Sequence, residues 1–80
     1  MTREEIIATV NSELAEEFEV EVSDITPEAN IKETLELDSL SLVDLVAMIE
    51  HLFKVKIPNT DLPSVKTFQN LYDYIEAHQA

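Results

Sequence analysis

The chain has 80 residues, of which 17 are acidic and 5 are basic, and its formal net charge is −12 at pH 7. This length fits one domain, and we expect residues 1–80 to form it. Cysteine and glycine are both absent, which excludes a disulfide scaffold, a thiolate metal site, a catalytic thiol and a glycine-rich phosphate loop, while the strong negative charge argues against nucleic-acid binding.

The first predicted helix begins after Thr2. Thr2 and Glu5 have the spacing of a capping box, in which each side chain binds the backbone N–H of the other residue. Apolar side chains then recur near the helical period, at Ile6, Ile7, Val10, Leu14 and Phe18. Eleven of the 17 acidic residues lie within the first 36 positions. We therefore expect a strongly acidic solvent face on this half of the protein.

Residues 19–38 are predicted to form a long structured loop. Val20 and Val22 alternate with glutamates as in a short strand, but a single strand would have no obvious partner. The Thr26-Pro27 pair indicates a break in regular structure. Three apolar residues are expected to anchor the loop in the core: Ile25, Ile31 and Leu35.

The second main helix is predicted to run from Ser39 to Phe53, with Asp38 as its N-cap. One stripe should face the core: Leu42, Leu45, Val46, Ile49 and Phe53. The opposite side carries Leu40, Val43, Asp44, Ala47 and His51. This outer side is more apolar than a solvent-facing surface requires, which favours contact with a partner. The alternative is that these are singly exposed apolar residues, which are common on protein surfaces.

One short helical turn is predicted from Asn59 to Leu62, after Ile57-Pro58. The last helix should span Thr67 to His78. Its core side is expected to carry Phe68, Leu71, Tyr72 and Ile75. The predicted fold is all-α: a small bundle of three main helices plus one short helix, with a long loop between the first and second main helices.

Catalysis, metal binding and membrane insertion are not predicted. A catalytic serine needs a general base within reach, and His51 would lie roughly 18 Å from Ser39 along the same helix. A glycine-containing calcium loop is absent. No apolar run approaches the ~20 residues of a membrane span, and the residues after Met1 do not resemble a secretory signal. We therefore expect a non-enzymatic, cytoplasmic protein.

The segment Leu37-Asp38-Ser39-Leu40-Ser41-Leu42 opens the second helix, and Ile57-Pro58 follows that helix. In these features the chain resembles the acyl carrier proteins, in which a D-S-L motif opens the second helix and an I-P follows it. The C-terminal residues 67–80 are similar to the end of a bacterial member. The resemblance covers essentially the whole chain.

The resemblance implies that a phosphopantetheinyl transferase attaches 4′-phosphopantetheine from coenzyme A to Ser39 through a phosphodiester. The terminal thiol of this arm would then carry an acyl group as a thioester. An exposed serine at a helix N-terminus suits an attached phosphate, and Asp38 is the acid that precedes the modified serine. No metal is implied, and we expect a monomer.

The resemblance also implies contacts with acyl-transfer and synthase enzymes whose basic patches are steered by the negative charge. The positions that would face these enzymes are Leu40, Val43, Asp44, Ala47 and Glu50. An acyl chain could lie between the helices, in a cavity lined by residues from the following set: Ile31, Leu45, Val46, Ile49, Leu62, Val65 and Leu71. For each of these residues, ordinary core packing is the alternative.

The sequence departs from the family pattern in three respects. Glu36 stands where many relatives have glycine, and since a non-glycine residue disfavours positive φ, the loop geometry is expected to differ. Acids that are common in and near the second helix are replaced by Ser41, His51 and Leu52, and Lys54 and Lys56 follow, which predicts altered partner choice. Leu62 and Leu71 stand where relatives have smaller residues, which predicts a smaller cavity.

The leading hypothesis is a carrier of fatty acid or related lipid biosynthesis. Within the same family, a specialised polyketide, peptidyl or D-alanyl carrier is the alternative. A different class is a non-modified acidic helical interaction domain, in which Ser39 would only cap a helix. A small hydrolase that uses Ser39 would need a base that the spacing does not supply.

Overall fold

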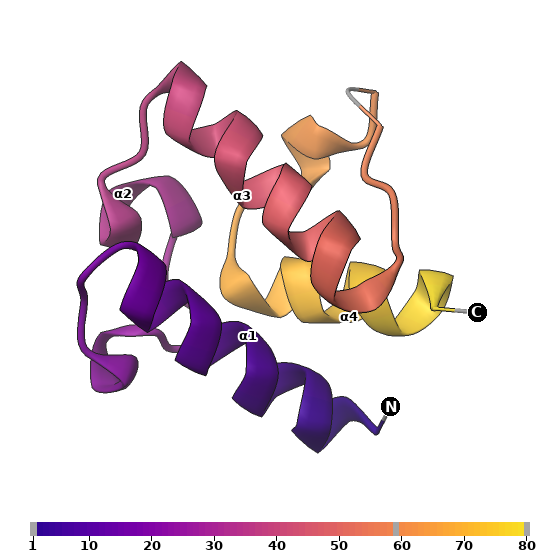
Figure 1. The fold of residues 1–80 in the computed structure, drawn as a ribbon, viewed down its shortest axis with the longest axis horizontal. Helices are drawn as coiled ribbons and strands as arrows, with labels where there is room; N and C mark the ends of the chain where they lie inside the picture. Colours follow the sequence, from indigo (N-terminus) through magenta and orange to yellow (C-terminus); the bar gives the residue numbers. More distant parts are fainter. Residues whose placement is uncertain (1, 59, 80) are drawn as a thin grey trace.

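The computed structural model describes residues 2–58 and 60–79. Within them, the α-helices are α1 (Arg3–Glu17), α2 (Ile31–Leu35), α3 (Ser39–Phe53) and α4 (Phe68–His78), and two short 3₁₀ helices are η1 (Val22–Asp24) and η2 (Leu62–Ser64) (Figure 1). The described residues contain no strand, and an isolated bridge pairs Asn30 with Thr67. The all-α prediction is confirmed. None of the helices in the described part of the chain is long and apolar enough to cross a membrane.

Helix α1 begins at the predicted capping box. The Thr2 hydroxyl accepts a hydrogen bond from the Glu5 backbone N–H (3.2 Å), and the Glu5 carboxylate accepts one from the Thr2 N–H (2.9 Å). The hydrogen bonds with Thr2 lower the pKa of Glu5. These bonds satisfy backbone N–H groups that the first turn of a helix leaves free.

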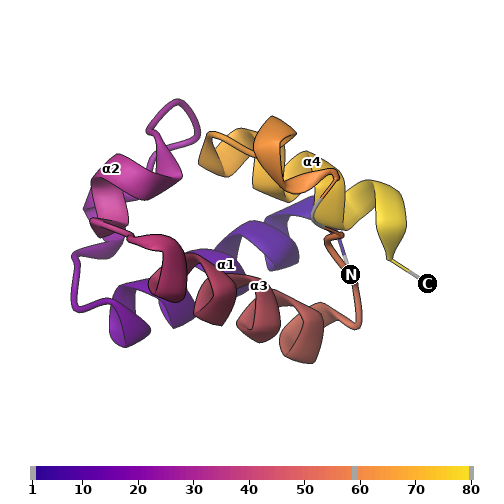
Figure 2. The same cartoon turned by 90° about the horizontal axis from the view of Figure 1, so that it is seen from above.

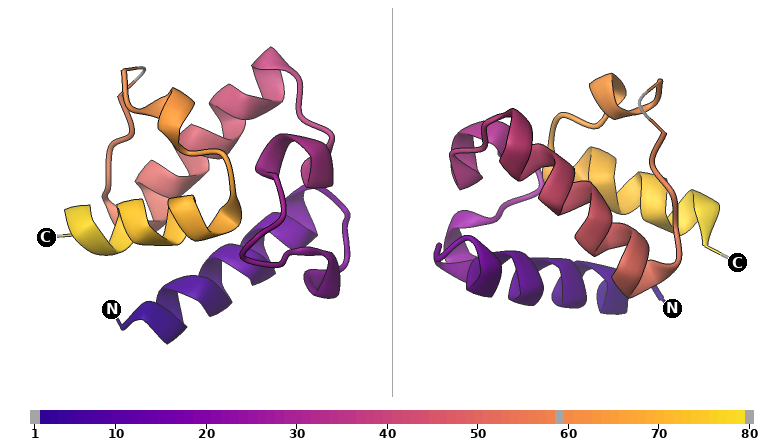
Figure 3. Two further views of the ribbon diagram at one scale, coloured as in Figure 1. Left: turned by 180° about the vertical axis from the view of Figure 1, so that it is seen from behind. Right: turned by 45° about the horizontal axis from the view of Figure 1, so that its top comes forward.

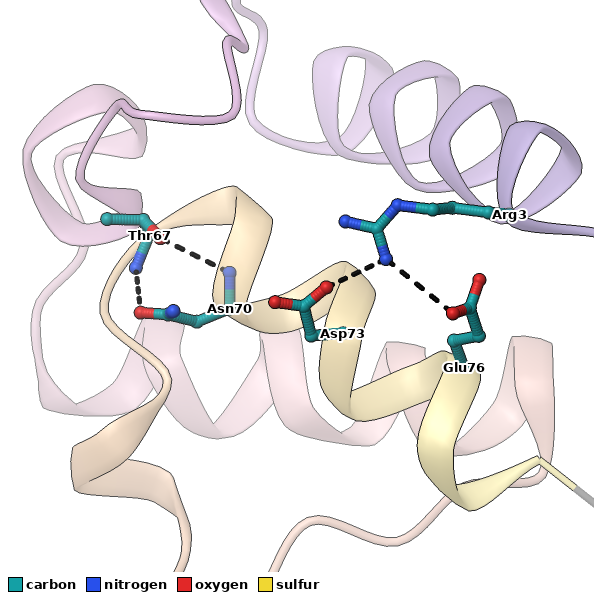
Figure 4. A network of polar contacts seen from close by, with 5 residues as sticks. All are labelled: Arg3, Thr67, Asn70, Asp73 and Glu76. Atoms are coloured by element: carbon teal, nitrogen blue, oxygen red, sulfur yellow. Dashed lines mark hydrogen bonds and ion pairs between the residues drawn. The ribbon is translucent and has the colours of Figure 1, made fainter.

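Helices α1 and α4 run in opposite directions (Figure 1) and are joined by polar contacts. The Arg3 guanidinium lies 2.7 Å from the Asp73 carboxylate and 3.9 Å from that of Glu76 (Figure 4). Further along, the Tyr72 hydroxyl donates a hydrogen bond to the Asn11 side chain. Burial raises the pKa of Tyr72.

The start of α4 is fixed by a second capping box, made by Thr67 and Asn70. The Thr67 hydroxyl accepts from the Asn70 N–H at 3.2 Å, and the Asn70 side chain accepts from the Thr67 N–H at 3.2 Å (Figure 4). Thr67 is therefore the N-cap, and the helix proper begins one residue later than predicted.

The hydrophobic core lies where α1, α3 and α4 face one another, and α2 closes one end (Figure 2). The predicted core side of α4 is buried, as are the loop anchors Ile25, Ile31 and Leu35. Of the apolar stripe predicted for α1, Ile6, Val10 and Leu14 are buried, whereas Ile7 and Phe18 are half-buried at its edges. On α3, Leu45, Ile49 and Phe53 are buried, whereas Leu42 and Val46 are half-buried. That difference matters because these two residues border a cavity described below.

The segment 19–38, predicted to be a long structured loop, contains two short helices that the prediction did not include, η1 and α2 (Figure 3). Val22 is exposed and begins a 3₁₀ turn. The start of α2 is capped by Asn30, whose side chain accepts from the Glu33 N–H at 3.0 Å. The Ile31 N–H donates to the Lys66 carbonyl at 2.9 Å. A helix this short depends on such distant bonds rather than on periodicity.

The predicted turn at Asn59–Leu62 is also shifted. The short helix η2 runs from Leu62 to Ser64 and has Pro63 in its first turn, where the missing proline N–H is not needed. Hydrogen bonds from the Asp61 and Leu62 N–H groups to the Pro58 carbonyl form a turn before it. Asn59 lies outside the described residues.

Candidate functional site

The N-terminus of α3 is capped by Asp38. Its carboxylate accepts a hydrogen bond from the Ser41 N–H at 2.8 Å. This bond from the Ser41 backbone is the largest cause that lowers the pKa of Asp38. The carboxylate is therefore ionised at neutral pH and engaged in the cap, and the first residue of α3 is Ser39.

Ser39 is exposed at this first helical position. Among the described residues, no hydrogen bond engages its hydroxyl. His78, one of the two histidines, lies on α4, where its Nδ1 contacts the Tyr74 carbonyl (2.9 Å) and its ring stacks on that of Tyr74. His51 lies at the other end of α3 from Ser39. This arrangement gives a free hydroxyl without a general base, and so does not support a hydrolase.

The outer side of α3 continues from Ser39 as an exposed strip. Leu40 is 78% exposed and Val43 is 65% exposed, and their spacing of three residues places both apolar side chains on the same side of the helix. Asp44 and Ala47 are also exposed, and Glu50 is half-buried at the edge. All five residues predicted to face partners thus lie on one helix that begins at Ser39.

An apolar cavity of about 270 Å³ lies on the inner side of α3 and is bordered by residues of α2, η2 and α4 as well. Six of the seven predicted lining residues border it: Ile31, Leu45, Val46, Leu62, Val65 and Leu71. The seventh, Ile49, is fully buried in the core and does not line the cavity, as expected from the alternative of ordinary core packing. A stripe on a helical wheel cannot separate residues that border a cavity from those one turn further along.

Six further lining residues were missed as cavity residues: Asn30, Lys32, Leu42, Ile57, Pro63 and Lys66. The helical stripe gave a signal for Leu42 alone, because it follows the same period as Leu45 and Val46. The others lie outside long helices, so their place depends on how the connecting segments pack.

A second hollow, of about 360 Å³, lies beside Ser39. It is lined by Lys32, Leu37, Asp38, Ser39 and Leu42. Lys32 and Leu42 border both this hollow and the apolar cavity. The hollow at Ser39 and the apolar cavity therefore adjoin each other at these two residues.

These features fit a covalently attached arm at Ser39. The hydroxyl is exposed and unengaged, its helix start favours an anionic substituent, and an apolar cavity of limited volume lies next to it. No cluster of potential metal ligands occurs among the residues that the structure describes. The fold and the site fit the class of small helical carrier proteins, with an exposed serine at the start of a helix as the candidate attachment point.

The comparisons with known proteins agree with this class. Residues 8–75 match the family model described as phosphopantetheine attachment site. The chain is 38% identical over 79 residues to the acyl carrier protein of Rubrobacter xylanophilus, which spans 99% of this chain and 98% of that protein. It is 41% identical over 75 residues to the acyl carrier protein of Thermotoga maritima, which spans 94% and 93% of the two chains.

A solved structure of the acyl carrier protein from Enterococcus faecalis superposes with a TM-score of 0.84 at 32% sequence identity, covering 99% of this chain and 100% of that chain. The chain belongs to the acyl carrier protein family. It is a non-catalytic carrier with a phosphopantetheine attachment site, and its partners are a phosphopantetheinyl transferase and acyl-handling enzymes. These predictions are confirmed at the level of the family.

Proposed function

We propose that Ser39 is the residue that carries the phosphopantetheine arm. The single observation that supports this most strongly is its exposed, unengaged hydroxyl at the first position of α3, beside the apolar cavity. When attached, the arm supplies the thiol on which an acyl group is carried. Asp38 holds the start of the helix through its bond to Ser41 and so keeps Ser39 at the surface.

The exposed strip of α3 is proposed as the surface that enzymes with basic patches contact. Leu40, Val43 and Ala47 supply apolar area, while Asp44 and Glu50 supply negative charge. The protein as a whole, with a net charge of −12, attracts such patches over a longer range. The cavity residues are proposed to receive an acyl chain: Ile31, Leu45, Val46, Leu62, Val65 and Leu71.

The attachment site is tested by intact-protein mass. The purified chain is incubated with coenzyme A and a broad-specificity phosphopantetheinyl transferase, in parallel with Ser39→Ala and Ser41→Ala. We expect the mass of one phosphopantetheine to be added to the native chain and to Ser41→Ala, but not to Ser39→Ala. Modification of Ser39→Ala, or no modification of the folded native chain, would overturn the proposal and return Ser39 to the role of a helix-capping residue.

We further propose that the carrier acts in fatty acid or related lipid biosynthesis, in the cytoplasm, as a monomeric single domain of residues 1–80. A specialised carrier is the second candidate, and one feature of α3 favours it. His51, Lys54 and Lys56 are all exposed and place basic groups at the end of α3 distant from Ser39. A partner of this end of the helix would need acidic rather than basic groups.

One relative with a specialised name is the meromycolate extension acyl carrier protein of Mycobacterium leprae. It is 38% identical over 76 residues, which span 95% of this chain and 66% of that protein. The two candidates are distinguished by purifying the carrier from the cells that make it and measuring the acyl groups by mass spectrometry. Saturated and 3-hydroxy fatty acyl groups would support the lipid role; polyketide, aminoacyl or D-alanyl groups would support a specialised role.

A further inference from the structure

We propose that Lys32 is a positioning residue for the phosphopantetheine arm on Ser39. The Lys32 ammonium neutralises the phosphodiester of the arm, so that the arm lies along α2 toward the apolar cavity. This inference rests on the proposed attachment at Ser39. It concerns a residue that the sequence analysis does not single out, because Lys32 lies in the segment predicted to be a long structured loop.

The argument begins with the position of Lys32. It borders the hollow beside Ser39 and also the apolar cavity, and of the lining residues only Leu42 does the same. An arm that starts at Ser39 and delivers an acyl group to the cavity therefore passes these two side chains. Leu42 offers apolar contact, whereas Lys32 offers the charge.

The second step is electrostatic. A phosphodiester carries one negative charge at neutral pH, and at Ser39 it would adjoin the ionised carboxylate of Asp38. The protein already carries a net charge of −12. Among the described residues that line this hollow, Lys32 is the only cation. The charge that best offsets the attached phosphate is therefore that of Lys32.

The third step is that Lys32 is available. Its side chain is exposed, and the ion pairs in the described part of the chain both involve Arg3. The backbone of Lys32 is fixed, since its carbonyl accepts from the Glu36 and Leu37 N–H groups. A fixed backbone with an unpaired ammonium suits a residue that holds a mobile arm by charge alone.

Lys66 provides a matched control within the same cavity. It borders the apolar cavity, as Lys32 does, but not the hollow that contains Ser39. Both side chains are exposed. The two lysines thus share their exposure and the apolar cavity but differ in closeness to the attachment point, which is the property on which the inference depends.

The test uses the holo protein and its ³¹P NMR signal, with Lys32→Gln, Lys66→Gln and Lys32→Arg as variants. In the native protein and in Lys66→Gln, the phosphodiester shift should change between 20 mM and 500 mM NaCl, because salt screens the contact with Lys32. In Lys32→Gln the shift should differ at low salt and respond less to salt, because only the repulsion by Asp38 and the other acids remains to be screened. Lys32→Arg should restore the native behaviour.

A second readout is chemical access to the cargo. With an octanoyl group loaded, cleavage by hydroxylamine should be about 1.5- to 5-fold faster in Lys32→Gln than in the native protein, which is the range expected for one exposed charge pair. Lys66→Gln, which changes the cavity lining but not the hollow at Ser39, should change the cleavage rate less than Lys32→Gln does. Thermal melting of the apo forms verifies that the substitutions leave the fold intact.

Three results would overturn the inference: coincident ³¹P shifts in all variants at both salt concentrations, equal effects of the two lysine substitutions, or no change in cleavage rate for Lys32→Gln. Absence of any ³¹P signal in the native protein after treatment with the transferase is a different result. It would mean that the arm is not attached, and the proposed function would fail before the role of Lys32 arises.

Discussion

Glu36 has a backbone conformation that non-glycine residues rarely adopt. Its φ of 53° and ψ of 48° lie in the left-handed region, so the expectation that a glutamate here avoids positive φ is wrong. The conformation is held because the Glu36 and Leu37 N–H groups both donate to the Lys32 carbonyl and so close the end of α2. Glu19 and Lys54 also have positive φ after helices in this glycine-free chain.

Glu36→Gly is therefore expected to raise the free energy of unfolding by about 0.5–1 kcal/mol. The left-handed conformation costs a non-glycine residue about 1–2 kcal/mol, which glycine avoids. The greater freedom of glycine in the unfolded chain offsets part of this stabilisation. Urea unfolding measures the change. Glu36→Gln is the control for the lost negative charge; if it stabilises the protein as much as glycine does, backbone strain at this position is not the cause.

At the scale of elements, sequence predicted the helices that are long enough to carry a stripe and a cap. Helix α3 has the predicted bounds, and α1 has its predicted capping box. Helix α2 and the short helices could not be found in this way. The segment that leads into α2 is held by bonds to distant residues, from the Phe68 N–H to the Ala29 carbonyl (3.3 Å) and from the Gln69 N–H to the Pro27 carbonyl (3.0 Å), while η1 and η2 are too short to show a period.

The same reasoning explains what was predicted of the site. Asp38 and Ser39 were identified because a cap and a helix start are local features, and the exposed strip of α3 because a helix fixes which residues share a side. The complete lining of the cavity depends on how α2 and the segment around η2 pack against α3. The helical pattern therefore did not point to Lys32 and Lys66, which border the cavity, and it grouped Ile49, which lies in the core, with the residues that do.

The packing of α1 against α4 is expected to depend more on Asn11 than on Arg3. Asn11→Ala should lower the free energy of unfolding by about 1–2 kcal/mol, because the hydroxyl of the buried Tyr72 loses its hydrogen-bond partner. Arg3→Ala should cost less than about 1 kcal/mol, since its ion pairs with Asp73 and Glu76 are solvent-exposed.

Urea unfolding of the two variants, with Tyr72→Phe and the double variant Asn11→Ala/Tyr72→Phe, tests this ranking. In the Tyr72→Phe background, Asn11→Ala should lower the free energy of unfolding much less than in the native protein, because no Tyr72 hydroxyl is left without a hydrogen-bond partner. Equal costs in the two backgrounds, or a larger loss from Arg3→Ala, would show that the hydrogen bond does not join the helices energetically.

The molecule is no larger than the distance over which its charged groups interact at low ionic strength. Its extents are 29 × 26 × 21 Å, and electrostatic interactions reach about 30 Å at 0.01 M salt but only about 8 Å at 0.15 M. At low salt, each acidic group therefore repels nearly every other one across the fold, and the net charge of −12 opposes the compact state.

We therefore expect the melting temperature to rise as NaCl increases from 0.01 M to 0.15 M. Salt also weakens the ion pairs of Arg3, which acts in the opposite direction, but two exposed pairs are outweighed by the surplus of acids. Glu17→Lys, at the exposed C-terminal end of α1, removes two units of negative charge and should reduce the salt dependence. A melting temperature that is flat or falls over this range in the native protein would show that repulsion among the acids does not limit stability. The acidic face of α1 would then impose no measurable cost on the fold, and its charge would remain available for attracting basic partners.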